Sequence, residues 1–251
     1  MSDRPPLGVV ILAAGRGKRM GSSLPKVLHP VAGEPMIVHA VRTARAMNPE
    51  KIVIVVCNGR DQVMDALNGG DIVFVEQARR LGTGHAVLQA REEFAGFQGN
   101  IVVLSGDVPL LSQMTLDKLL HKHYVSHAAA TFLSVIFDNP VGYGRMVRNG
   151  DGSLDRIVEE KDCTGEFHSI KEVNAGVYVF DAPQLFRYLP EIGKDNAQGE
   201  YYLPDVQALM KSAGLPVAIY QVPDSREVGG VNSPEQLAEV NRIYGELYEN
   251  N

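Results

Sequence analysis

Short apolar runs alternate with helical patterns along the first half of the chain. The apolar runs are continuous, as expected of strands that are buried on both faces of a sheet. In the segments between them, apolar residues recur every three or four positions, which is typical of helices. The strand segments are LGVVILA, KIVIVVC, DIVFVEQ and NIVVLSGD, and the helical segments are PMIVHAVRTARAM, RDQVMDAL and GHAVLQAREEF. Strands interleaved with helices predict βαβ units in a parallel sheet.

The pattern changes from about residue 128 onward. AAATFLSVIF and EVNAGVYVF predict further strands. Two more strands flank residues 149–152, whose sequence Asn-Gly-Asp-Gly indicates a β-hairpin. YYLPDVQALMKSAG and SPEQLAEVNRIYGELYE predict helices, the second with Ser233 as N-cap and Gln236 at the site where a capping box has Glu or Gln. We expect this half to be a mixed antiparallel insertion over the sheet.

These patterns predict an α/β protein with a doubly wound, mostly parallel sheet and a mixed antiparallel second lobe. A chain of 251 residues lies near the upper size of one domain, and no low-complexity linker or internal repeat divides it. We therefore expect a single domain, 1–251. Its first lobe would span about 7–127, its second lobe about 128–233, and a C-terminal helix 233–251.

Composition and charge exclude several classes of protein. Hydrophobic residues make up 45% and charged residues 22%, which is ordinary for a globular enzyme. The net charge of -6 argues against general binding to nucleic acid or an anionic membrane. No apolar run approaches the roughly 20 residues of a membrane span, and the N-terminus does not resemble a signal peptide, so we expect a cytoplasmic protein. The two cysteines, Cys57 and Cys163, are expected to be reduced thiols.

A glycine-rich segment with four cations and no carboxylate follows the first apolar run. It is not a dinucleotide fingerprint, because Met20 occupies the third glycine site. It is not a P-loop either, because Leu12 and Arg19 stand where that motif has Gly and Ser or Thr. A dehydrogenase is therefore the least favoured of the alternative functions.

The remaining features of this segment are typical of a polyphosphate site. Arg16, Lys18, Arg19 and Lys26 can neutralise phosphate charge, and glycines let the backbone approach a ligand. The segment also follows a strand, where an open α/β sheet places its ligand. A solvated basic turn is the alternative, but it is disfavoured because four unpaired like charges repel.

The segment LAAGRGKRMGSSLPKVLHPVAGEPM resembles the L-x-x-G-x-G-T-R-M-x(4-5)-P-K signature of sugar-nucleotide pyrophosphorylases. The likeness is greatest to the uridyltransferase domain of the bifunctional bacterial enzyme that makes UDP-N-acetylglucosamine. Further motifs follow in the same order over residues 7 to about 233, namely QARRLGTGHA, SGDVPLL, VGYGR, IVEEKDC, EVNAG, NAQGEYYLPD and GVNS. The resemblance implies a Rossmann-like nucleotidyltransferase fold that binds a nucleotide in its first lobe and a sugar in its second.

The resemblance implies which residues hold the nucleoside. A glutamine amide can pair with both a donor and an acceptor on a uracil edge, and the amides of a Gly-Thr-Gly turn can complete such a ring of contacts. His85 is expected only to begin a helix, because no partner for it is evident. The implied nucleoside-binding residues are Leu12, Ala13, Ala14, Gly15, Gln77, Gly82 and Thr83.

Asp107 and Asn232 are the expected ligands of a magnesium ion. Asp107 follows the buried strand NIVVL, where a carboxylate beside phosphates is unfavourable unless it holds a divalent cation. The alternative for Asp107 is a turn or cap residue. Asn232 resembles the second protein ligand of the family, although the residue pattern alone makes it the residue before the Ser233 cap.

Four residues of the second lobe are implied to contact N-acetylglucosamine. Gly144 can offer a backbone amide, Glu159 can accept from hydroxyls, Asn174 can donate and accept, and Tyr202 can add a flat face or a hydroxyl. The alternatives are a bend at the glycine, Glu160 in place of Glu159 for the carboxylate role, and a core position for the tyrosine. Lys161 either approaches the sugar phosphate or pairs with a neighbouring carboxylate.

Three positions depart from the family pattern. Lys18 replaces a threonine, Ser105 replaces an aromatic residue that some members use, and Pro204 falls where other members have threonine near the sugar. A cation at position 18 is compatible with phosphate binding. Proline at position 204 lacks the hydroxyl of that threonine and removes one expected contact with the sugar.

The implied reaction is Mg²⁺-dependent uridylyl transfer from UTP to N-acetylglucosamine 1-phosphate, with release of pyrophosphate. Arg19 and Lys26 are the expected triphosphate ligands and catalytic residues. The alternatives are transfer to glucose 1-phosphate, use of another nucleoside triphosphate, and a non-catalytic nucleotide sensor.

The hexapeptide repeats of the relative's second, acetyltransferase domain do not occur in these 251 residues. The chain is therefore either a single-function transferase or a fragment of a longer protein. Acetyl-CoA binding is not expected, and the sequence does not determine the oligomeric state.

Overall fold

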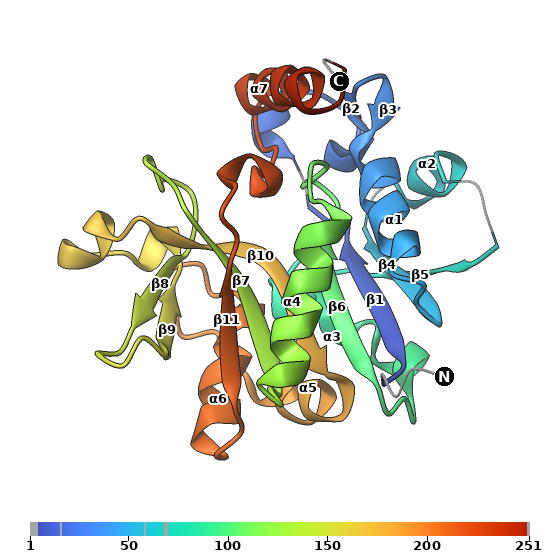
Figure 1. The fold of residues 1–251 in the computed structure, drawn as a ribbon. Coiled ribbons are helices and arrows are strands. Elements are labelled where there is room, and N and C mark those ends of the chain that lie inside the picture. Colours follow the sequence, from blue (N-terminus) through green and yellow to red (C-terminus); the bar gives the residue numbers. More distant parts are fainter. Residues whose placement is uncertain (1–4, 16, 58, 68–69, 250–251) are drawn as a thin grey trace.

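The computed structural model describes residues 5–15, 17–57, 59–67 and 70–249, and its main element is one twisted sheet (Figure 1). The order of its central strands is β11-β7-β10-β6-β1-β4-β5, and β8 and β9 form a hairpin that joins β10. The strands are β1 (Leu7–Leu12), β4 (Lys51–Val56), β5 (Ile72–Glu76), β6 (Asn100–Ser105), β7 (Ala130–Ile136), β8 (Arg145–Arg148), β9 (Leu154–Val158), β10 (Glu172–Asp181) and β11 (Val217–Gln221). A separate two-stranded ribbon consists of β2 (Pro30–Val31) and β3 (Glu34–Pro35).

The first half of the chain forms the parallel sheet that its apolar runs predict. β1 pairs in parallel with both β4 and β6, and β4 pairs in parallel with β5. Helices cover both faces of the sheet, so the predicted doubly wound α/β class is confirmed. The helices are α1 (Met36–Ala46), α2 (Arg60–Asp65), α3 (Thr83–Leu88), α4 (Gln113–Val125), α5 (Ala182–Tyr188), α6 (Val206–Ser212) and α7 (Pro234–Tyr244).

The core consists of two apolar layers that the pleat of each strand separates. In β1, Val9 and Ile11 face the layer beneath α1, α2 and α4, whereas Val10 faces the layer beneath α3, α5 and α6. All three side chains are fully buried. Because successive residues of a strand point to opposite faces, a strand covered on both sides has no polar position, and this explains the continuous apolar runs.

The second half extends the same sheet, and the expectation of an insertion lying over the sheet is wrong. β10 lies between β6 and β7 and pairs antiparallel with both, and β11 then pairs in parallel with β7. The predicted hairpin is present as β8 and β9, which project from β10 (Figure 1). This arrangement brings β10 and the β8–β9 hairpin of the second lobe close to β6.

One helical prediction is wrong, and two helices, α4 and α5, were not predicted. GHAVLQAREEF is not one helix, because α3 ends at Leu88 and a separate 3₁₀ turn covers Arg91–Phe94. Helix α4 was not predicted at all, although Ser112 caps it by accepting a hydrogen bond from the Thr115 amide at 3.1 Å.

The C-terminal helix α7 begins as predicted, with the Ser233 hydroxyl accepting from the Gln236 amide. The Gln236 side chain does not complete a capping box, since its Oε1 atom accepts from the Asn232 amide at 2.8 Å rather than from Ser233. The helix packs against the β2–β3 ribbon, where Asn241 accepts a hydrogen bond from the Ala32 amide. Across the described ranges, no helix combines the length and apolar character needed to cross a membrane.

Candidate active site

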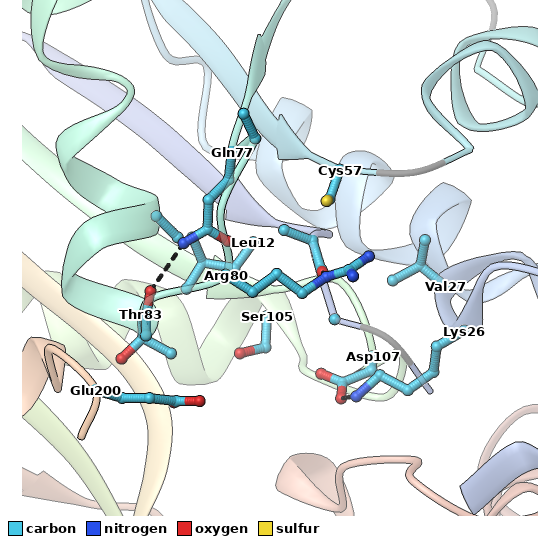
Figure 2. A pocket seen from close by; sticks show the side chains of 15 residues that line it. Leu12, Lys26, Val27, Cys57, Gln77, Arg80, Thr83, Ser105, Asp107 and Glu200 are labelled. Carbon is cyan, nitrogen blue, oxygen red and sulfur yellow. Dashed lines mark hydrogen bonds and ion pairs between the residues drawn. The ribbon is translucent and has the colours of Figure 1, made fainter. Parts of the chain in front are cut away.

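Two adjoining pockets open at the carboxyl edge of the parallel strands. The larger has a volume of about 790 Å³ and the smaller about 330 Å³, both within the range of small-molecule sites. They share four lining residues, Thr83, Ser105, Asp107 and Glu200. Figure 2 shows the larger pocket, with Lys26 and Asp107 on one side and Gln77 and Thr83 on the other.

The topology of the sheet explains where the pockets lie. From β1 the chain crosses toward β4, whereas from β6 it crosses in the opposite direction toward β7. The loops after β1 and β6 therefore diverge and leave a crevice, which is the usual ligand position in an open α/β sheet. The amide of Gly106 donates to Leu12 O at 2.9 Å and holds the two strand ends together at the floor of this crevice.

Lys26, Asp107 and Asn232 meet in the crevice. The Lys26 ammonium donates to a carboxylate oxygen of Asp107 and to the side-chain oxygen of Asn232, the latter at 2.9 Å. The Lys26 and Asp107 side chains are only 12% and 15% exposed. The Val231 amide donates to Asp107 O at 3.0 Å, which places Asn232 beside the loop that follows β6.

The oxygen atoms around the Lys26 ammonium can be compared with the ligands that a magnesium ion prefers. A carboxylate oxygen and an amide oxygen converge on one cation, and Mg²⁺ prefers such oxygen ligands. In the part of the chain that the structure describes, no cluster of three or more His, Cys, Asp or Glu side chains could hold a metal. Two protein oxygens fit an ion that completes its coordination with waters and substrate phosphates.

Gln77 lies at the opposite end of the larger pocket and is 3% exposed. Its Nε2 atom contacts Gly82 O and Nδ1 of His85, both at 3.0 Å. His85 therefore orients the amide of Gln77, a role that the sequence did not suggest. Because Nε2 has these two partners, Oε1 is the atom that can accept a hydrogen bond from a ligand.

Gly82 and Thr83 join the two lobes above this end of the pocket. Gly82 has φ +110°, and a Cβ atom there would lie 2.4 Å from Tyr201 O, so only glycine fits. The Gly84 amide donates to Tyr201 O at 2.8 Å, and the Leu203 amide donates to the Thr83 hydroxyl at 3.0 Å. The Gly82–Thr83 turn and the segment that carries Tyr202 are therefore held as one unit.

The glycine-rich loop lies partly as expected. Leu12, Ala14 and Gly15 line the larger pocket. Ala13 is buried and is not among the described residues that line either pocket, since its amide donates to Val55 O at 2.8 Å.

The cations of that loop lie in different environments. Among the cations of the loop whose side chains the structure describes, Lys26 alone lines the larger pocket. Arg19 is exposed and absent from the described lining of both pockets. Arg16 and the side chain of Lys18 lie outside the described residues.

Arg80 is a cation of the larger pocket that the sequence analysis did not select. Its Nε donates to Ala14 O at 2.7 Å, and its side chain extends across the pocket between Gln77 and Lys26 (Figure 2). The available signal was its position three residues after Gln77 in the motif QARRLGTGHA. A guanidinium here can contact phosphate oxygens.

All four expected sugar-binding residues line the smaller pocket. A Cβ atom at Gly144 would lie 3.0 Å from Oε1 of Glu159, so the backbone of Gly144 approaches that carboxyl closely. The amide of Asn174 donates to Gly144 O at 2.8 Å. The Tyr202 hydroxyl donates to Asp162 and accepts from Gln198 at 2.8 Å.

The Glu159 carboxyl has an unusual protonation equilibrium. Burial, together with the nearby carboxylates of Asp205 and Asp162, raises the pKa of Glu159 to about 7. Burial and Asp162 also raise the pKa of Asp205 to about 6. The smaller pocket is therefore an acidic site that favours hydroxyl donors, whereas the larger pocket has cations for an anionic ligand.

Several lining residues of the smaller pocket escaped the sequence analysis. The Tyr178 hydroxyl accepts from the side-chain amide of Asn174 at 2.8 Å, and the Tyr143 hydroxyl accepts from the backbone amide of Gly230 at 3.2 Å.

Ser105 and Pro204 both line the smaller pocket, so two of the three departures from the family pattern fall at the site. Lys161 is exposed and is not in the described lining of the pocket.

Comparisons with known proteins agree with this fold. Residues 9–160 match the MobA-like NTP transferase domain family. A bifunctional protein GlmU from Lactobacillus gasseri is 48% identical over 94% of this chain and 51% of its own length, and one from Dechloromonas aromatica is 48% identical with the same coverage. One from Stutzerimonas stutzeri is 46% identical over 95% of this chain and 52% of its own length.

The chain spans about half the length of the curated relatives that it matches. A solved structure of a putative glucose-1-phosphate thymidylyltransferase from Bacillus anthracis, in complex with a sucrose, superposes with a TM-score of 0.74. The superposition covers 94% of each chain, and the two sequences are 20% identical. This likeness supports a common fold. The resemblance to sugar-nucleotide pyrophosphorylases is confirmed, and the chain belongs to the MobA-like NTP transferase domain family of nucleotidyltransferases.

Proposed function

We propose that this nucleotidyltransferase moves the uridylyl group of UTP to N-acetylglucosamine 1-phosphate and releases pyrophosphate. The observation that supports the proposal best is the meeting of Lys26, Asp107 and Asn232 between a nucleotide-sized pocket and an acidic, sugar-sized one. A phosphate from each of the two substrates would lie at the junction of the pockets. The cation and the proposed metal ligands are found at this junction.

The chemistry needs alignment and charge neutralisation more than proton transfer. A phosphate oxygen of the sugar 1-phosphate attacks the α-phosphorus of UTP, and the bond from that phosphorus to the pyrophosphate oxygen breaks. Because the attacking oxygen is already ionised near neutral pH, no general base is required. The cations of the larger pocket stabilise the charge that develops on the leaving group.

Asp107 and Asn232 would hold Mg²⁺, and the charge of the bound ion would orient and polarise the α-phosphate. In the structure their oxygens hold the Lys26 ammonium, so Lys26 has to release them when it contacts phosphate. Arg80 is placed to contact the triphosphate beside Lys26. The role of Arg19 stays a prediction, because its side chain is exposed.

The nucleoside and sugar roles follow from the two ends of the site. Oε1 of Gln77 can accept from the N3–H group of uracil, and the Gly82–Thr83 turn closes over that end. Gly144, Glu159, Asn174 and Tyr202 would contact the sugar. Pro204 lies in the same pocket and has no side-chain donor, which makes glucose 1-phosphate the second candidate acceptor.

The direct test is pyrophosphate release from UTP and Mg²⁺ with N-acetylglucosamine 1-phosphate. We expect the fastest release with this pair, because the pockets offer an acceptor for uracil N3–H and donors and acceptors for an acetamido sugar. Glucose 1-phosphate and the other nucleoside triphosphates serve as controls. Faster release with another pair would overturn the specificity, and no release with any pair would overturn the reaction.

Replacing Lys26 by alanine should lower turnover by about 10² to 10³, the usual cost of losing one transition-state ligand. Lys118→Ala is the matched control, since Lys118 is an exposed lysine on α4. The measurement is kcat at saturating substrates, with thermal unfolding to verify that both variants are folded. A folded Lys26→Ala protein with the turnover of the control would contradict the phosphate role.

Sugar binding should improve as the pH rises through 7. Glu159 accepts from sugar hydroxyls when ionised, and its pKa of about 7 means that the acid form dominates at pH 6 and the carboxylate at pH 8. The ionised fraction grows about tenfold over this range. The KM for the sugar 1-phosphate should fall by a similar factor.

The Glu159→Gln variant removes this dependence while the sugar phosphate itself still titrates. The ratio of the two KM values, measured between pH 6 and pH 8, therefore isolates the effect of Glu159. Parallel pH profiles would exclude a role for the ionised carboxylate, and a ratio that changes in the opposite direction would mean that the carboxylic acid donates to the sugar.

A further inference from the structure

Arg145 is a buried cation that the proposed reaction does not use. It is the first residue of β8, and its side chain is only 1% exposed. An isolated buried charge is unfavourable, so its partners explain why it is tolerated. Its Nη1 atom donates to the carbonyl oxygen of Tyr143 and to Oε2 of Glu160, the latter at 2.8 Å.

Glu160 connects this cation to the loop before β8. The same Oε2 atom accepts from the Gly142 amide at 3.0 Å. Burial alone would raise the pKa of Glu160, but the Gly142 amide and Arg145 outweigh it and hold that pKa below its usual value. One carboxylate therefore fixes residues 142–145 from both ends.

The fixed loop forms one wall of the smaller pocket. Gly144 follows Tyr143 directly, its carbonyl oxygen accepts from the Asn174 amide at 2.8 Å, and its Cα lies against the Glu159 carboxyl. Glu159 is also the chain neighbour of Glu160. A shift of the loop would thus displace three of the four residues expected to contact the sugar.

Tyr143 extends the same unit toward the cation site. Its ring packs against Phe137 with a centroid distance of 4.9 Å, and its hydroxyl accepts from the Gly230 amide at 3.2 Å. Gly230 lies two residues before Asn232, and Val231 between them donates to Asp107 O. The loop is therefore joined by hydrogen bonds to the segment that carries a proposed metal ligand.

We propose that Arg145, Glu160 and Tyr143 form a positioning unit that sets the sugar-contacting wall and braces the Gly230–Asn232 segment. The inference rests on the proposed function for the identity of the ligands. None of the three side chains acts as an attacking or leaving group. They act through Gly144, Glu159 and Asn232, so their replacement should change substrate and metal affinity more than the chemical step.

The first test compares Glu160→Ala and Glu160→Gln with Glu166→Ala, an exposed carboxylate on the following 3₁₀ turn. Calorimetry measures the affinity for UDP-N-acetylglucosamine and for UDP. The first affinity divided by the second gives the contribution of the sugar to binding. We expect the ratio to fall about tenfold in Glu160→Ala, by less in Glu160→Gln because its amide oxygen can still accept, and not in the control. UDP affinity should stay unchanged.

Kinetics and amide exchange add two independent readouts. In both Glu160 variants the KM for the sugar 1-phosphate should rise while kcat and the KM for UTP stay near the wild-type values. Exchange of the Gly142 amide should accelerate in Glu160→Ala. Glu160→Gln covers the case in which the alanine variant is unfolded.

An unchanged affinity ratio in both Glu160 variants would overturn this inference without touching the proposed function, whether the two affinities stay at the wild-type values or fall by the same factor. Wild-type protein that binds UDP-N-acetylglucosamine but releases no pyrophosphate would instead overturn the proposed reaction, and the affinity ratio would still decide the positioning role.

Tyr143→Phe tests the link to Asn232, since it removes only the hydroxyl that accepts from Gly230 and keeps the ring against Phe137. The Mg²⁺ concentration for half-maximal pyrophosphate release should rise about fivefold, the order of one lost hydrogen bond. Direct titration with Mn²⁺, followed by electron paramagnetic resonance, should show a matching loss of affinity. An unchanged Mn²⁺ affinity would exclude Tyr143 from the unit.

Discussion

The contact of the Lys26 ammonium with Asp107 and Asn232 is the interaction on which the organisation of the site depends. These residues are 81 and 206 positions from Lys26 in the sequence, and they meet only because the sheet places the ends of β1 and β6 side by side. A partly buried cation needs oxygen partners, and the two oxygens that it uses are those that suit a divalent ion. The apolar core behind them holds this arrangement rigid, because both faces of β1 and β6 are covered by helices.

Charge divides the site into two halves with different chemistry. The larger pocket has Lys26 and Arg80, which suit phosphate, whereas the smaller pocket contains Glu159 and is close to Asp162 and Asp205. Carboxylates near phosphate would repel it, so the acidic half is suited to the neutral, hydroxyl-rich part of a substrate. Thr83 and Gly82 connect the halves through the segment at Tyr201–Leu203, so the two pockets are held in a fixed relative position.

Much of the fold and part of the site could be predicted from the sequence. Strands buried on both faces leave continuous apolar runs, and glycines at sharp turns leave ordered motifs, so β1, β4, β5 and β6 and the Gly82–Thr83 turn were predictable. Helix α4 was not, because its buried face includes polar residues. His123 in that face contacts Thr131 and Asn100 at 2.9 and 3.1 Å, and such a buried polar network hides the apolar period of a helix.

The remaining differences arise from contacts between distant segments. The placement of β10 between β6 and β7 depends on pairing over more than 30 residues, which no local pattern records. Ala13 and Arg19 both belong to the motif from which their binding roles were predicted. In the structure, the amide of Ala13 donates to a carbonyl of the sheet, and the Arg19 side chain is exposed. In the sequence, Arg145 and Glu160 are not distinguished from other charged residues near the hairpin. The structure shows that Arg145 is buried and paired with Glu160.

We propose that Lys26 and a divalent cation use the same two oxygens in turn, so that Lys26 is released to phosphate when the substrates and metal bind. Crystal structures of the protein alone and with Mg²⁺ and UDP-N-acetylglucosamine measure this directly. We expect a metal between Asp107 and Asn232 in the complex, with the Lys26 ammonium on a phosphate oxygen. A complex in which Lys26 still joins Asp107 to Asn232, with the metal held elsewhere, would contradict it.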